Sequence, residues 1–216
     1  MPKEEASGGI KGMRIAITGN AGSGKSTLAK VFQYKFGGKV LSFATPLKQF
    51  CVQIRGREID KGLDRPLLQK LGQYYRRDCN ADEVLLQLDL DGNSPGEFYA
   101  FRSLDYVYGK ERNKNFWVDR LIEEVRKSPD DNVFNDDTRF LSEEAELKKH
   151  GFTIVKLVAS QKTCIKRLEA LYGPVDPNMF KDKSETEIRL IDADITVNAE
   201  QPVDNIFRIV VSQLFV

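Results

Sequence analysis

Hydrophobic residues along the chain alternate between short apolar runs and longer stretches in which they recur every three or four positions. The short runs have the length of buried strands and lie at 13–18, 39–43, within 132–140, at 152–158 and at 193–198. The longer stretches predict amphipathic helices and lie at 24–36, 64–78, 116–127, 142–150, 161–171 and 203–214. Strands that alternate with helices predict an α/β protein with three layers, in which helices cover both faces of a central parallel sheet of about five strands.

The stretch 79–114 is the least regular part of the chain. Residues 89–96 have turn chemistry, and the aromatic residues that follow show no clear period; they are Phe98, Tyr99, Phe101, Tyr106 and Tyr108. We expect a packed insertion or a homodimer contact. Because cations lie between these aromatic residues, stacking on single-stranded nucleic acid is the alternative; these cations are Arg102, Lys110, Arg112 and Lys114.

A complete GxxxxGKS phosphate-binding motif follows the first apolar run. It precedes a helical pattern, which is the context that the motif requires. Lys25 is expected to reach the β- and γ-phosphates of a nucleotide, and the Ser26 hydroxyl to bind Mg²⁺. The expected ATP contacts are Asn20, Ala21, Gly22, Ser23, Gly24, Lys25, Ser26 and Thr27. The motif predicts nucleotide binding, but it does not by itself distinguish a kinase from a GTPase, a motor ATPase or a nucleotide sensor.

The stretch 132–140 is the second informative segment. It predicts a short strand with acidic residues at its carboxyl end, the edge at which parallel sheets bind ligands. Asp137 is expected to serve a metal ion there, as the second acidic motif of phosphate-loop enzymes does. Arg139 is expected to contact a phosphate of a second substrate. The alternative is an aspartate that caps a helix and an arginine on the surface.

Residues 172–190 interrupt the regular pattern with glycine, prolines and charges. In a phosphotransferase a lid lies here, which excludes water and brings cations to the transferring group. Arg167, Lys181 and Lys183 are the candidate lid cations. An ordinary charged loop is the competing interpretation.

Composition adds limits on partners and location. A formal net charge of +1 with 30% charged residues gives no overall bias toward nucleic acid or anionic membranes. No apolar run reaches the length that spans a bilayer, and the first residues lack the apolar core of a signal peptide. We expect a cytoplasmic protein, in the host cytoplasm if it is viral, with a frayed tail at 1–12 and a single domain at 13–216. The three cysteines and the single histidine have no metal-ligand spacing.

Several blocks together resemble the phage-type deoxynucleoside monophosphate kinases, in the same order and over most of the chain. The blocks are 42–48, 65–72 with Arg76, 116–118, 137–140 with Glu143 or Glu144, 184–185 and 194–198. Two features depart from the family pattern: the stretch 79–114 is longer, and Lys183 stands where the family has histidine.

This resemblance implies transfer of a phosphoryl group from ATP to a nucleoside monophosphate, which gives the diphosphate. It implies that the acceptor is held by Phe43, Lys48, Arg65, Arg76, Trp117 and Arg139. It also implies that Asp137 serves Mg²⁺ and that Asn198 lies near the ATP base. Nucleic acid and membranes are not expected partners.

Two other functions remain open at this stage. A kinase of the same clan that acts on phosphomevalonate or dephospho-CoA has the same loop and arginines, and differs only in its acceptor pocket. A regulatory protein that binds ATP without transferring its phosphate also has the loop. A GTPase is disfavoured, because the chain has no NKxD-type motif for reading guanine.

Overall fold

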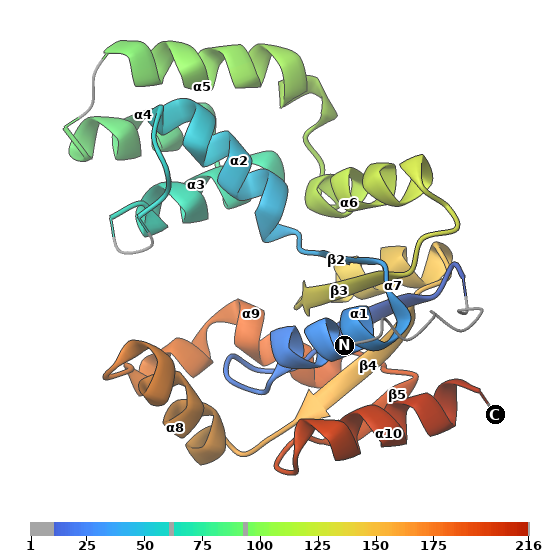
Figure 1. Cartoon of the computed structure of the whole chain (residues 1–216). Helices are drawn as coiled ribbons and strands as arrows, with labels where there is room; N and C mark the ends of the chain where they lie inside the picture. The colour runs from blue at the N-terminus through green and yellow to red at the C-terminus, as the bar shows by residue number, and fades with distance from the viewer. Residues whose placement is uncertain (1–10, 61–62, 93–94, 216) are drawn as a thin grey trace, which may run out of the picture. The chain divides into compact units, whose positions relative to one another are not determined.

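A computed structural model describes residues 11–60, 63–92 and 95–215 (Figure 1). The chain forms two compact units. Residues 43–123 make up one, which we call the helical unit. The described residues on either side, 11–42 and 124–215, make up the other, which we call the sheet unit. The expected tail at 1–12 lies largely outside the described residues, and Gly12 donates a backbone hydrogen bond to Asp130 (2.9 Å).

The sheet unit contains five parallel strands in the order β2-β3-β1-β4-β5. The strands are β1 (Arg14–Thr18), β2 (Lys39–Leu41), β3 (Val133–Thr138), β4 (Thr153–Val158) and β5 (Ile195–Asn198). Because all five are parallel, their carboxyl ends meet at one edge. The predicted parallel sheet of about five strands is therefore confirmed.

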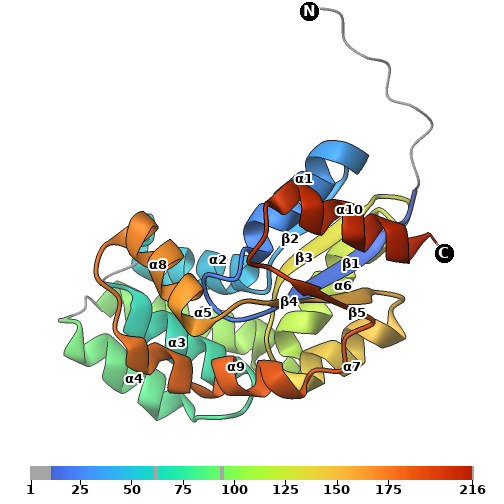
Figure 2. The ribbon, with the colours of Figure 1, turned by 90° about the horizontal axis from the view of Figure 1, so that it is seen from below.

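Helices cover both faces of this sheet, as predicted (Figure 2). On one face lie α1 (Lys25–Phe36) and α10 (Val203–Leu214), which bury a core with the sheet that includes Ile15, Phe32 and Val155. The other face carries α7 (Leu141–Lys149), and α8 (Gln161–Tyr172) follows β4 at the carboxyl edge of the sheet, beside the phosphate-binding loop. The lid-like stretch then folds as η2 (Pro177–Lys181), α9 (Lys183–Thr186) and η3 (Glu187–Leu190). The three-layer α/β fold of phosphate-loop NTPases is thus present.

The helical unit is built around aromatic side chains. Its elements are α2 (Ala44–Arg55), α3 (Arg65–Tyr75), α4 (Ala81–Leu90), α5 (Pro95–Tyr108), η1 (Gly109–Glu111) and the start of α6 (Phe116–Lys127). Phe50, Tyr75, Phe116 and Trp117 contact one another with ring centroids 4.6 to 6.3 Å apart. The aromatic residues of 79–114 thus belong partly to a packed core, since Phe101 is buried against Tyr74.

Arg112, which sequence reasoning considered for nucleic-acid binding, is a structural residue of the helical unit. Its guanidinium lies 3.6 Å from the centre of the Tyr74 ring and donates to the backbone oxygens of Tyr74 (2.7 Å) and Cys79 (2.9 Å). Within the described residues, no helix is both long enough and apolar enough to cross a membrane.

Candidate nucleotide site

The phosphate-binding loop connects β1 to α1 at the carboxyl edge of the sheet (Figure 1). Two of its glycines are required because other elements pack closely against the loop. A Cβ on Gly22 would lie 2.5 Å from the backbone oxygen of Cys164, and one on Gly19 would lie 2.6 Å from that of Leu157. Gly22 also has a φ of +79°, a conformation that favours glycine. The loop is therefore held between α8 and β4 in a shape that side chains would prevent.

The loop ends in a row of free hydrogen-bond donors. The backbone N–H groups of Gly24, Lys25, Ser26 and Thr27 have no acceptor among the residues that the structure describes. They stand at the amino terminus of α1, where the helix dipole favours negative charge. This is the arrangement that binds phosphate oxygens.

Lys25 is buried in this loop, with 7% of its surface exposed. Its ammonium donates to the backbone oxygens of Gly19 and Asn20. Burial and then the positive charge of Arg139 lower the pKa of Lys25 to about 8, although Glu185, Asp137 and Asp136 act in the opposite direction. Because burial has removed water from the Lys25 ammonium, an anion that binds beside it would stabilise the charged form.

Asp136, on β3, is a second carboxylate near the loop, and both it and Asp137 act on the charge of Lys25. Burial raises the pKa of Asp136, and the nearby Ser26 hydroxyl acts in the opposite direction. Sequence reasoning missed this residue and paired Ser26 with Asp137. Neighbouring residues of a strand point to opposite faces, and the sequence does not reveal which of two consecutive aspartates points to the loop.

Asp137 accepts hydrogen bonds from the Ser42 hydroxyl (2.6 Å) and the Asn135 amide (3.0 Å). Its predicted role toward Mg²⁺ stays a prediction. The oxygen donors present at this edge, a serine hydroxyl and two carboxylates, are the hard ligands that Mg²⁺ prefers. Of the two carboxylates, Asp136 is the one whose pKa responds to Ser26.

Arg139 lies beside the loop, as the second cation of the site. Its backbone N–H donates to the Glu143 carboxylate (2.8 Å), and one guanidinium nitrogen pairs with Glu185. Glu185 also accepts a hydrogen bond from the loop amide of Ala21 (2.8 Å). In the sheet unit, Arg139, Glu185, Asp137 and Asp136 all lie near enough to Lys25 to shift its pKa.

Arg167 lies on the helix predicted at 161–171, and its predicted role as a lid cation stays a prediction. It lies on α8 and donates to the backbone oxygens of Ser23 (3.2 Å) and Ala199 (2.8 Å). It thus braces the loop against the end of β5, because its guanidinium is already bonded on both sides. Lys181 is exposed on η2, and the side chain of Lys183 lies outside the described part of the chain.

Asn198 lies at the end of β5 and is exposed. Its side-chain oxygen accepts a hydrogen bond from the Glu200 backbone (2.9 Å). Its predicted approach to the ATP base stays a prediction.

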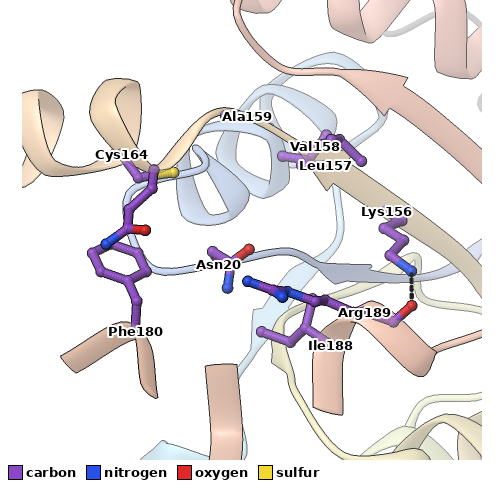
Figure 3. Close-up of a pocket in the computed structure, with 10 residues that line it drawn as sticks. Asn20, Lys156, Leu157, Val158, Ala159, Cys164, Phe180, Ile188 and Arg189 are labelled. Atoms are coloured by element: carbon purple, nitrogen blue, oxygen red, sulfur yellow. Dashed lines mark hydrogen bonds between the residues drawn. The ribbon is translucent and has the colours of Figure 1, made fainter. Parts of the chain in front are cut away.

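A cavity of about 370 Å³ opens beside the loop, between the end of β4, α8 and the lid-like stretch (Figure 3). Its walls are largely apolar and include Leu157, Cys164, Phe180 and Ile188. The Lys156 ammonium is already bonded to the backbone oxygens of Arg189 (3.1 Å) and Ile191 (2.9 Å). Lys156 therefore holds η3 against β4.

The predicted acceptor residues other than Arg139 belong to the helical unit, where they differ in exposure. Lys48 and Arg65 are exposed, and Arg76 is half-buried. Phe43 is buried. Trp117 is only 2% exposed, and its indole N–H donates to the Gly72 backbone (3.3 Å). Trp117 is a core residue of the helical unit, and its predicted contact with the acceptor stays a prediction.

The similarity of this chain to known proteins is one of fold. No protein-family model matches the sequence, and a comparison with curated proteins finds no match. A gluconokinase from Sinorhizobium meliloti 1021 matches with a TM-score of 0.53 and 14% identity, over 94% of this chain and 92% of that one. A shikimate kinase from Aquifex aeolicus vf5 matches with a TM-score of 0.52 and 16% identity, over 94% and 96%. The chain therefore has the phosphate-loop NTPase fold that these kinases share.

Proposed function

We propose that this protein is a kinase that transfers the γ-phosphoryl group of ATP to a nucleoside or deoxynucleoside monophosphate. The observation that carries the proposal is the position of Arg139 beside the phosphate loop. Arg139 lowers the pKa of Lys25, and it pairs with Glu185, whose carboxylate also accepts a hydrogen bond from the loop amide of Ala21. A second cation beside a triphosphate cradle suits a reaction that brings two anions together. Similarity in fold to two kinases supports phosphoryl transfer in general.

The mechanism relies on position and charge. Phosphoryl transfer asks little covalent chemistry of the protein, because charge spreads over the oxygens of the transferring group. The amides of residues 24–27 and Lys25 hold the donor phosphates, and Arg139 screens the repulsion between donor and acceptor. A phosphate monoester is itself anionic, so the attacking oxygen needs no general base.

Magnesium fits the residues at this edge. The Ser26 hydroxyl and the carboxylates of Asp136 and Asp137 are the groups that would hold it. A magnesium ion held by these residues would supply positive charge to the donor phosphates. Asp136 and Asp137 would both act from the carboxyl end of β3.

The monophosphate acceptor rests on the resemblance of several blocks to the phage-type deoxynucleoside monophosphate kinases. Those blocks supply Lys48, Arg65 and Arg76 from the helical unit and Arg139 from the sheet unit. We infer that the three cations of the helical unit bind the acceptor phosphate and sugar.

One assay tests the proposal. Release of ADP from ATP and Mg²⁺ is followed with a panel of ribo- and deoxyribonucleoside monophosphates, together with phosphomevalonate, dephospho-CoA, gluconate and shikimate. We expect at least one nucleoside monophosphate to raise ADP release about tenfold or more and to appear as its diphosphate. Stimulation by another acceptor alone would identify a different small-molecule kinase, and ATP binding without stimulation would indicate a regulatory ATP-binding protein.

A further inference from the structure

Glu185 is a buried carboxylate in the middle of the nucleotide site, with 3% of its surface exposed. It lies on α9, in the lid-like stretch. One of its oxygens accepts hydrogen bonds from the Ala21 backbone (2.8 Å) and the Asn20 side chain (3.0 Å), and the other pairs with Arg139. The backbone oxygen of Glu185 also accepts from the Asn20 side chain (3.1 Å). One residue thus joins the lid-like stretch, the phosphate loop and Arg139.

These bonds leave the groups needed for phosphate binding open. Within the described residues, the Nε and second Nη of Arg139 have no hydrogen-bond partner, and the side chain is 31% exposed. The amides of residues 24–27 also remain free of acceptors in that part of the chain. Glu185 therefore fixes one side of the Arg139 guanidinium and leaves the other side available, without covering the phosphate cradle.

We propose that Glu185 is a positioning residue for phosphoryl transfer, which holds Arg139 at the orientation needed to contact the transferring group. This proposal rests on the proposed function. Arginine binds phosphate through a planar fork, so its orientation decides how many hydrogen bonds it forms. A guanidinium already anchored on one side loses less freedom when it binds the phosphate on the other.

A double-mutant cycle tests this with Glu185→Gln, Arg139→Ala and the combined variant. Glu187→Gln serves as the matched control, because Glu187 is a carboxylate of the same stretch and its carboxylate accepts from Leu141 at 3.4 Å. We expect Glu185→Gln to lower kcat about tenfold or more while the Kd for ATP changes less than about threefold. The combined variant should be no slower than Arg139→Ala alone, because both changes remove the same interaction.

Two results would overturn the proposal. If Glu185→Gln binds ATP tenfold more tightly and keeps its kcat, the carboxylate competes with phosphate instead of positioning Arg139. If the losses of the two single variants multiply, the two residues act independently.

A second measurement needs neither phosphoryl transfer nor a stable variant. The mobility of the Arg139 Nε–H in the wild-type protein is compared by NMR with that of Arg189, which is exposed. We expect Arg139 to be the more rigid of the two, with and without ATP. Equal mobility would refute the anchoring of Arg139 by Glu185 even if the protein proved to have no kinase activity. A rigid Arg139 in a protein without acceptor-dependent ADP release would refute the proposed function, and with it the role in phosphoryl transfer, but not the anchoring.

Discussion

The two units use buried charge in different ways. At the phosphate loop of the sheet unit, backbone donors have no acceptor among the described residues, and Lys25 keeps its charge with a lowered pKa. In the helical unit, Asp64 is fully buried and accepts four hydrogen bonds, from Arg55 (2.9 Å), from Arg57 (2.8 and 2.9 Å) and from the Asp60 backbone (2.8 Å). Backbone donors without an acceptor indicate a site that binds an anion. A carboxylate whose oxygens already accept several hydrogen bonds, such as Asp64, indicates a structural role.

The pKa of Asp64 follows from this saturation. Burial raises the pKa of a carboxyl, but the hydrogen bonds from Arg57 and from the Asp60 backbone outweigh that effect and lower it. Arg55 extends the network to Asp91 and Glu97. The helical unit therefore contains a charged network that holds α2, α3 and α5 together.

The largest expected effect comes from removing the central cation of the sheet unit. Replacing Lys25 with alanine should lower kcat/KM about a thousandfold, because the triphosphate loses its buried positive charge. Folding should be largely preserved, since Lys25 is held in an unfavourable environment. Steady-state kinetics and thermal unfolding measure both effects. Lys30→Ala, an exposed lysine on α1, is the control and should retain full activity. Full activity in Lys25→Ala would refute the assigned role of this lysine.

In the helical unit, a substitution in the charged network around Asp64 should reduce stability rather than activity. Asp64→Asn should lower the free energy of unfolding by about 3 kcal/mol or more, since buried arginine charge loses its partner. Chemical denaturation measures this loss, and Asp89→Asn on the exposed side of α4 is the control. A loss below about 1 kcal/mol would mean that Asp91 and Glu97 compensate for Asp64.

The lowered pKa of Lys25 predicts how stability depends on pH. The unfolded chain has Lys25 at its ordinary pKa of 10.5, and the folded chain at about 8. Between these values the unfolded state binds more protons, so Lys25 makes the free energy of unfolding rise with pH, by up to about 3 kcal/mol. Lys25→Met should lack this rise. The check is the difference between the two proteins' stability curves from pH 7 to 10.5, and parallel curves would contradict the lowered pKa.

Much of the sheet unit was predictable from the sequence, because its signals are local. The loop motif, the apolar runs and the helical spacing of 24–36 and 203–214 each lie within one segment, and all five strands occur close to the expected positions. Which of the two aspartates, Asp136 or Asp137, lies near Ser26 was not predictable. It depends on the register of β3 against β1, which shifts between Ala16 and Thr18.

The helical unit was harder to predict, for a physical reason. The stretch 79–114 forms α4 and α5, and their buried residues pack against α2 and α3. The spacing of hydrophobic residues within the stretch alone therefore does not show which of them are buried. Trp117 illustrates the same limit. A tryptophan in a motif suggests a ligand contact, and only the fold shows that Phe50, Tyr75 and Phe116 surround it.

The smallest expected effect concerns the part of the helical unit that is assigned to the acceptor. Arg65 is exposed at the start of α3, and its guanidinium has no hydrogen-bond or ion-pair partner in the described ranges. Replacing it with alanine should leave stability unchanged and raise the KM for the acceptor about tenfold, which corresponds to roughly 1.4 kcal/mol for one charged contact. The KM for ATP should stay the same, because the proposed donor site lies in the sheet unit. Arg102→Ala, an exposed arginine on α5, is the control for loss of charge alone. If both variants raise the acceptor KM equally, the helical unit acts through its general charge and Arg65 makes no specific contact.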